Sequence, residues 1–146
     1  MEGEKNEVIV SAQNQPGLVA KIQAEGQTLI IDESGLATGV KAGPDPYDYI
    51  MGALGACTVI TLHMYAKRKD WPLERAEVRL NHERVYADDC NNCENKDAKI
   101  NQVTKKLFLY GPLTPEQRQR LEDISSRCPV QKTLEASIQV KTILQE

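Results

Sequence analysis

A run of apolar residues at helical spacing, between residues 46 and 69, limits the folds open to this chain more than any other part of its sequence. Its members recur at intervals of three and four, which is the period of one face of an α-helix. They are Tyr47, Ile50, Met51, Leu54, Cys57, Thr58, Thr61, Leu62 and Tyr65. Asp45 and Pro46 are typical of a helix start, and the basic run 67–69 suits a helix end. The sequence therefore predicts one long helix. Its small residues leave one face bare, so that another element can approach closely; these are Gly52, Ala53, Gly55 and Ala56.

Short segments rich in β-branched residues precede this helix. They predict strands over 7–11, 18–24 and 28–32. The sequences Gln15-Pro16-Gly17 and Glu25-Gly26 separate them and are typical of tight turns. We therefore expect a meander of antiparallel strands before the helix.

A second group of elements follows the helix. In order, we expect strands over 76–86 and 103–110 that pair as a long hairpin, a helix from residue 115 to about Arg127, a turn at Cys128-Pro129-Val130 and a closing strand over 137–144. Thr114 and Gln117 have the spacing of a helix-capping pair, and Pro115 suits the first helical position. The order of strands, long helix, strands, short helix and strand predicts an α+β fold.

The totals of the chain fit one globular domain over residues 1–146. The net charge is −3, and the sequence has no stripe of basic residues that could bind phosphate groups. Both observations argue against a nucleic-acid partner. The apolar run over 50–64 contains glycines and threonines and is too short for a bilayer, so we expect no membrane partner. The first residues lack the apolar stretch of a secretory signal. We therefore expect a cytoplasmic protein, in which four cysteines favour thiol chemistry or metal binding over permanent disulfides.

The residues that surround Cys57 and Cys128 suggest a function for these two cysteines. Taken alone, Cys57 on the apolar helix face would be a small buried hydrophobe, which is where free cysteines most often lie. The two surrounding segments are Asp45-Pro46-x-Asp48-x-Ile50-x-Gly52-Ala53-Leu54-Gly55-Ala56-Cys57 and Cys128-Pro129-Val130-x-x-Thr133-Leu134. In this order, one on a helix and one at a helix end, they resemble the OsmC/Ohr family of hydroperoxide-handling proteins over nearly the whole chain.

This resemblance implies a fold, an oligomeric state and a reaction. Members of the family are intertwined homodimers whose two long central helices pack together, with each active site at the dimer interface. Cys57 would attack an organic hydroperoxide and become a sulfenic acid, and Cys128 would then condense with it to a disulfide. A dithiol reductant, lipoyl-type or other, would reduce that disulfide, so neither a cofactor nor a metal is implied. An apolar mouth of Tyr47, Ile50 and Met51 would favour alkyl hydroperoxides over hydrogen peroxide.

The chain departs from the family pattern in its charged residues. Peroxidases of the family use an N-terminal arginine to hold the thiolate and an upstream glutamate to orient that arginine. This chain has no arginine before Arg68, and the upstream acid falls at Asp48, our third candidate site residue. A lysine is a flexible point charge and does not freely replace a planar guanidinium. We therefore expect the activating cation to come from Arg127 or from a basic residue of the partner subunit.

Two classes of function remain open. The retained Cys57 and Cys128 favour a thiol peroxidase that reduces organic hydroperoxides. The missing N-terminal arginine favours a protein of the same fold that binds a lipid or another small molecule, or senses redox state, without efficient peroxidase turnover.

A second cysteine pair, Cys90 and Cys93, lies in a polar segment between the two hairpin strands. It resembles a loop found in a subset of OsmC-like proteins. The spacing suits a loop disulfide or two zinc ligands, with His82 as a third ligand. A structural zinc site wants four ligands and the chain has no second Cys-x-x-Cys, so we predict no metal site. Three interpretations of this loop stay open. The two cysteines are incidental thiols, or they form a disulfide or bind a metal, or they act as a redox relay to Cys57 and Cys128.

Overall fold

The structure is a computed structural model that describes residues 7–86 and 99–145. The chain divides into two compact units, residues 1–50 and residues 51–146. The boundary falls inside the long helix, so the first turn of that helix belongs to the first unit. The single domain expected over 1–146 stays a prediction.

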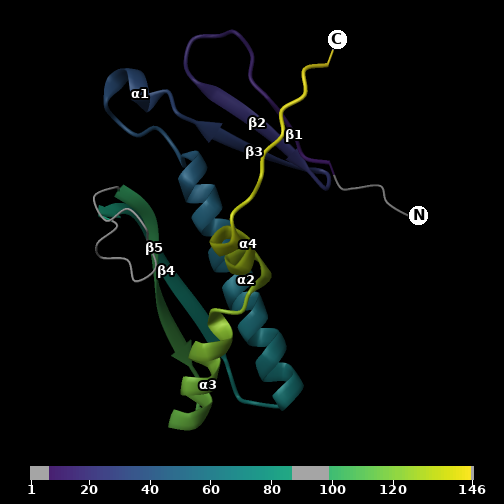
Figure 1. The fold of residues 1–146 in the computed structure, drawn as a ribbon, viewed down its shortest axis with the longest axis vertical. Coiled ribbons are helices and arrows are strands. Elements are labelled where there is room, and N and C mark those ends of the chain that lie inside the picture. The colour runs from purple at the N-terminus through teal and green to yellow at the C-terminus, as the bar shows by residue number, and fades with distance from the viewer. Residues whose placement is uncertain (1–6, 87–98, 146) are drawn as a thin grey trace, which may run out of the picture. The chain divides into compact units, whose positions relative to one another are not determined.

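The first unit contains a three-stranded antiparallel sheet (Figure 1). Its strands are β1 (Ile9–Ser11), β2 (Val19–Ala24) and β3 (Gln27–Asp32), in the order β1-β2-β3. Between β2 and β3, Glu25 and Gly26 have φ of 47° and 74°, the positive values that a two-residue hairpin turn requires. The predicted meander is therefore confirmed. A short helix that the sequence did not predict, α1 (Gly35–Thr38), follows β3.

The predicted long helix is confirmed as α2 (Pro46–Lys69), 24 residues in length. Asp45 caps it, because its carboxylate accepts a hydrogen bond from the Asp48 backbone N–H at 2.8 Å. The whole of α2, which extends beyond the apolar run over 50–64, is by length and composition alone long and apolar enough to cross a membrane. One face of α2 nevertheless packs inside the second unit, and we identify it as a core helix.

The predicted hairpin and second helix are also confirmed. Strand β4 (Arg75–Tyr86) pairs antiparallel with β5 (Lys99–Tyr110) along its whole length, from Arg75 opposite Tyr110 to Tyr86 opposite Lys99. Helix α3 (Pro115–Ser125) starts with the expected capping box: the Gln117 N–H donates to Thr114 Oγ1 at 3.1 Å, and the Thr114 N–H donates to Gln117 Oε1 at 2.9 Å.

The core of the second unit lies where α2, α3 and the hairpin meet. Four buried residues form its centre: Leu62, Tyr65, Leu121 and Ile124. Leu62 and Leu121 are fully buried, and each contributes about 1.5 to 3 kcal/mol of hydrophobic stabilisation. Further along α2, an added Cβ at Gly55 would lie 2.9 Å from Leu80 Cδ1. Of the four small residues, Gly55 thus lies against strand β4, whereas Gly52, Ala53 and Ala56 are exposed.

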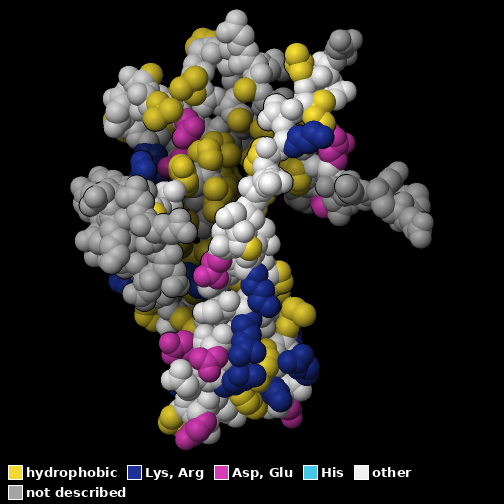
Figure 2. Space-filling model, in the orientation of Figure 1, with side chains coloured by type: hydrophobic (Ala, Val, Ile, Leu, Met, Phe, Trp, Pro, Cys, Tyr) yellow, Lys and Arg dark blue, Asp and Glu magenta, His cyan; other side chains and the backbone are white. Residues whose placement is uncertain are grey.

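The last turn of α2 is basic, as predicted. The Arg68 guanidinium and the Lys69 ammonium lie 5.2 and 5.8 Å from the centre of the Tyr65 ring. Arg120 of α3 donates a hydrogen bond to the Tyr65 hydroxyl at 3.0 Å. Figure 2 shows Lys and Arg side chains gathered over this end of the second unit. Positive charge here complements the C-terminal end of the helix dipole.

Two predictions for the end of the chain were wrong. The residues after Cys128 form a helix, α4 (Pro129–Ala136), instead of a turn. Pro129 occupies the first helical position, where its missing N–H leaves no hydrogen bond unmade. Within the described residues 137–145 there is no strand. Ile138 and Val140 are 60% and 85% exposed, and a strand needs a neighbouring sheet edge to satisfy its backbone.

Candidate active site

The structure brings Cys57 and Cys128 together, which the sequence alone did not establish. Cys57 lies on α2 and is half-buried, whereas Cys128 is the N-cap residue of α4 and is fully buried. Both are free thiols. Cys57 lies close enough to Cys128 that its thiol helps to lower the pKa of Cys128. Two residues 71 positions apart in the sequence thus form one thiol pair.

The surroundings of Cys128 favour its thiolate form. Burial opposes ionisation and is the largest single effect on its pKa. The Gln131 backbone N–H, the Thr58 hydroxyl, the Cys57 thiol and the charge of Lys105 act together in the opposite direction, so the pKa of Cys128 lies below its ordinary value. The Gln131 N–H makes no full capping hydrogen bond. Its contact is the weak attraction that the N-terminus of a helix offers an anion.

Thr58 joins the thiol pair to a lysine. Its hydroxyl, which is fully buried, lies 3.6 Å from Cys128 Sγ and donates to the Leu54 carbonyl at 2.8 Å. Lys105 of β5 donates to the same hydroxyl oxygen at 3.1 Å, to the Ser125 carbonyl at 2.9 Å and to Gln131 Oε1 at 2.6 Å. Burial lowers the pKa of Lys105, while the negative charges of Cys128, Glu135 and Cys57 oppose that shift.

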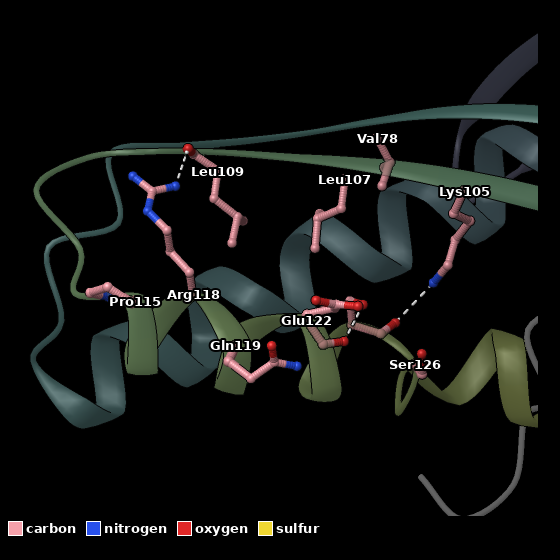
Figure 3. Close-up of a pocket in the computed structure, with 10 residues that line it drawn as sticks. Val78, Lys105, Leu107, Leu109, Pro115, Arg118, Gln119, Glu122 and Ser126 are labelled. Atoms are coloured by element: carbon pink, nitrogen blue, oxygen red, sulfur yellow. Dashed lines mark hydrogen bonds between the residues drawn. The ribbon is translucent and has the colours of Figure 1, made fainter.

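A cavity of about 690 Å³ approaches Lys105 from the side of α3. Figure 3 shows Leu107 and Leu109 of β5 lining it opposite Gln119 and Glu122 of α3. Arg118 spans the other end and donates to the Leu109 carbonyl at 2.8 Å. Neither cysteine lines this cavity. We therefore place the chemistry at the thiol pair, with Lys105 between the pair and the cavity.

Asp48, the third predicted site residue, lies in the first unit at the start of α2. Its carboxylate accepts a hydrogen bond from the Asp45 N–H at 2.9 Å and binds the Lys41 ammonium at 2.5 Å. The hydrogen bond from Lys41 is the first cause of the lowered pKa of Asp48. This acid thus completes the helix cap and holds a lysine of the N-terminal region.

The other candidate residues contribute less. Arg127, expected as the activating cation, is exposed and forms no side-chain hydrogen bond or ion pair in the part of the chain that is described. Among the described residues, Lys105 is a cation that acts on Cys128, whereas a basic residue of the partner subunit stays a prediction. Cys90 and Cys93 lie outside the described residues. His82 Nε2 lies 3.0 Å from Asn101 Oδ1, and within 7–86 and 99–145 no three His, Cys, Asp or Glu side chains form a metal-binding group.

The sequence pattern of β5 indicates that Lys105 faces inward, although Lys105 was not predicted as a site residue. Val103, Leu107 and Leu109 alternate along β5 and face inward, and Lys105 occupies the same phase of this pattern. A lysine at an inward-facing strand position is unusual unless it has a polar partner. For Thr58 the signal is weaker, because threonine on the buried face of a helix commonly bonds only the carbonyl four residues earlier.

The site thus contains a half-buried thiol beside a buried thiol of lowered pKa, with the Lys105 ammonium bonded to the hydroxyl next to it. The sequence profile of the OsmC-like protein family matches residues 38–143. The chain belongs to this OsmC-like protein family. No curated protein matches the sequence.

Solved structures of low sequence identity share the fold. The OsmC-like protein from Mycoplasma pneumoniae is 15% identical and matches 92% of this chain and 89% of its own, with a TM-score of 0.68. The organic hydroperoxide resistance protein OhrB of Bacillus subtilis is 18% identical, with 86% and 88% covered and a TM-score of 0.59. A protein from Legionella pneumophila described as the organic hydroperoxide resistance protein OsmC is 14% identical, with 89% and 90% covered and a TM-score of 0.61.

Proposed function

We propose that this protein is a thiol peroxidase that reduces organic hydroperoxides with Cys57 and Cys128 and is regenerated by a dithiol. The observation that carries the proposal is the thiol pair itself: a half-buried Cys57 beside a buried Cys128 whose pKa is lowered by Cys57 and its other polar neighbours. Membership of the OsmC-like family supports it, as does the likeness of the fold to proteins named for organic hydroperoxide resistance.

The oxidative half of the reaction uses both sulfurs. Cys57 gives its proton to the Cys128 thiolate, and the resulting Cys57 thiolate attacks the terminal oxygen of the hydroperoxide. The O–O bond breaks, the alkoxide takes up a proton and leaves as the alcohol, and Cys57 becomes a sulfenic acid. Cys128 sulfur then attacks the Cys57 sulfur and expels the hydroxyl group as water, forming the disulfide. The hydroperoxide is reduced by two electrons and the cysteine pair is oxidised by two.

A turnover assay tests this proposal. Reduced protein receives cumene hydroperoxide and dihydrolipoamide, and the loss of peroxide is followed beside two variants. We expect Cys57→Ser to lose turnover entirely. Cys128→Ser should turn over much more slowly, because it lacks both the thiolate that accepts the Cys57 proton and the thiol that resolves the sulfenic acid. Equal and negligible rates for the wild type and Cys57→Ser would reject the peroxidase.

That negative outcome would favour the alternative function, a protein of this fold that binds a lipid or another small molecule or senses redox state. The sequence feature that supports the alternative is the absence of any arginine before Arg68. A binding protein would take up a small apolar ligand with the same affinity in the wild type and in Cys57→Ser, which equilibrium dialysis against a labelled fatty acid measures.

We keep Asp48 in the proposed site as the acid that holds Lys41, the nearest counterpart in this chain to the arginine-orienting glutamate of the family. Asp48→Asn tests this role, because an amide oxygen still accepts the Asp45 N–H while the charge is lost. Lower turnover at an unchanged melting temperature would support a functional role. Loss of stability with unchanged turnover would assign Asp48 to the helix cap alone.

We also propose that the protein is a cytoplasmic homodimer. On α2, the exposed residues Ile60 and Met64 continue the face that begins with the small residues Ala53 and Ala56. Two α2 helices packing along this face would bury it. The exposed, alternating apolar residues of the C-terminal segment would add to a sheet edge of the second copy, which would supply the strand partner that residues 137–145 lack.

A further inference from the structure

Lys105 has a position that neither a surface lysine nor an ordinary core residue would take. Its three hydrogen bonds all go to neutral oxygens, those of Thr58, Ser125 and Gln131. Within the described part of the chain no carboxylate lies within ion-pair distance of its ammonium group. A partly buried cation without an anion is costly unless the site acquires negative charge at some stage of its work.

The Thr58 hydroxyl can transmit the effect of the Lys105 positive charge to Cys128. A hydroxyl has one proton, and here it can point to the Leu54 carbonyl at 2.8 Å or to Cys128 Sγ at 3.6 Å. Lys105 donates to the oxygen of the same hydroxyl, which polarises the O–H bond and leaves its proton free for either acceptor. When Cys128 becomes an anion, the proton turns to the sulfur and the stronger, charge-assisted bond forms.

The two sulfurs also differ in access. Cys128 is fully buried, whereas Cys57 is half-buried. In thiol–disulfide exchange the incoming thiolate must reach the sulfur that it attacks along the S–S axis, and the other sulfur leaves as an anion. Exchange is faster when the leaving sulfur is the more stabilised thiolate. The greater accessibility of Cys57 and the stabilised negative charge on Cys128 therefore both predict that the reductant attacks Cys57.

We infer that a dithiol reduces the Cys57–Cys128 disulfide by attacking Cys57, and that Cys128 leaves as a thiolate whose charge Lys105 stabilises through the Thr58 hydroxyl. Lys105 acts through another residue and is therefore a positioning residue. This inference rests on the proposed function for the disulfide itself. In the first step the reductant thiolate forms an S–S bond to Cys57 and the bond to Cys128 breaks. In the second step the other thiol of the reductant closes its own disulfide, and Cys57 leaves and is protonated.

Two titratable groups act on Cys128, Lys105 from β5 and Cys57 from α2, and Glu135 from α4 acts on Lys105. Glu135 accepts a hydrogen bond from Gln131 Nε2 at 3.2 Å, and Gln131 Oε1 in turn accepts from Lys105. The Gln131 amide thus stands between the carboxylate and the ammonium group, which keeps the lysine charge available to the sulfur.

The first test identifies the sulfur that is attacked. The full-length protein is oxidised with diamide instead of peroxide, so the result does not depend on peroxidase activity. It is then mixed briefly with 2-mercaptoethanol, acid-quenched, blocked with N-ethylmaleimide and mapped by mass spectrometry; Cys57 and Cys128 fall in separate tryptic peptides. We expect the mixed disulfide on Cys57. A mixed disulfide on Cys128, or failure of diamide to link the two cysteines, would overturn the inference.

The second test measures the rate at which dithiothreitol reduces the diamide-formed disulfide. Lys105→Gln keeps a hydrogen-bonding side chain but loses the charge, and we expect reduction to slow about tenfold as the leaving sulfur becomes more basic. Lys105→Arg should restore most of the rate. Lys106→Gln, one residue along β5 and exposed, is the matched control and should react like the wild type.

Equal rates for Lys105→Gln and Lys106→Gln would show that Lys105 does not act on the leaving sulfur. Circular dichroism establishes that each variant folds. If Lys105→Gln does not fold, Thr58→Val provides the same test with the lysine still present, and an unchanged rate in that variant would count equally against the inference. Because diamide forms the disulfide without peroxide, the rate of its reduction tests this inference separately from the proposed peroxidase activity.

Discussion

At the scale of single residues, the thiol pair is controlled by one hydroxyl. The Thr58 hydroxyl oxygen lies 3.1 Å from the Lys105 ammonium nitrogen and 3.6 Å from Cys128 Sγ. Its Oγ1 is close enough to both groups to relay charge without a water molecule. The chemistry of Cys128 should therefore respond to the loss of a single oxygen atom at residue 58.

Thr58→Val removes that oxygen with little change of volume. A hydrogen bond to a charged group contributes about 1.5 to 3 kcal/mol, so we expect about tenfold less Cys128 thiolate at a fixed pH below its titration. The ultraviolet absorbance of the thiolate, measured against pH in a Cys57→Ser background, reports this change. Thr61→Val on the same helix is the control. Coincident titration curves for the two variants would contradict the role given to Thr58.

The pH dependence of stability follows from the same residue. Because the folded-state pKa of Cys128 is lowered, the folded state binds fewer protons than the unfolded state between the two pKa values. Cys128 therefore contributes stability that is fully present above the unfolded thiol pKa of about 8.5 and is lost as pH falls through the folded pKa. The lowered pKa of Lys105 acts in the same direction, since the folded state holds the Lys105 proton less tightly than the unfolded state does.

We expect the difference in unfolding free energy between reduced wild type and Cys128→Ala to grow as pH rises toward the ordinary thiol pKa. The slope for one group is at most about 1.4 kcal/mol per pH unit. Urea denaturation at a series of pH values under reducing conditions measures it. A difference that stays constant or shrinks with rising pH would show that the folded state does not favour the Cys128 thiolate.

At the scale of elements, local signals in the sequence predicted what local forces decide. The capping pair at Thr114 and Gln117, the helical period of α2 and the turn at Glu25-Gly26 all act within a few residues, and each was predicted correctly. Helix α4 was missed because Cys128 is an uncommon N-cap residue and Pro129 suits a turn as well as a first helical turn. The pairing of Lys105 with Thr58 joins residues 47 positions apart, and no local pattern reports such a contact.

The capping box of α3 gives a prediction at this scale. Thr114→Ala removes the acceptor of the Gln117 N–H and should destabilise the protein by about 1 kcal/mol. Thr114→Ser keeps the hydroxyl and should stay close to the wild type. Urea denaturation compares the three proteins. Equal losses in the two variants would assign the effect to the threonine methyl group instead of the cap.

At the scale of the whole molecule, the apolar surface is larger than one copy of the chain can bury. Ile60 and Met64 of α2 are 57% and 67% exposed, and Ile138 and Val140 of the C-terminal segment are more exposed on average. A strand was predicted at this segment because its residues alternate, yet alternation specifies a strand only where a sheet edge is available. The alternating pattern alone therefore did not specify a strand in the described residues 137–145.

If α2 forms the centre of a homodimer, charge placed on its exposed face should separate the two copies. Ile60→Glu combined with Met64→Glu would bury two unpaired carboxylates, at several kcal/mol each, and we expect a monomer by sedimentation velocity where the wild type is a dimer. Gln102→Glu combined with Gln119→Glu adds the same charge at exposed positions of β5 and α3 and should leave the dimer intact. A wild-type monomer, or a dimer that survives both charges on α2, would require another partner for this face. Because α2 also carries Cys57 and Thr58, peroxide turnover of the separated copies would then report whether one thiol pair works without a second.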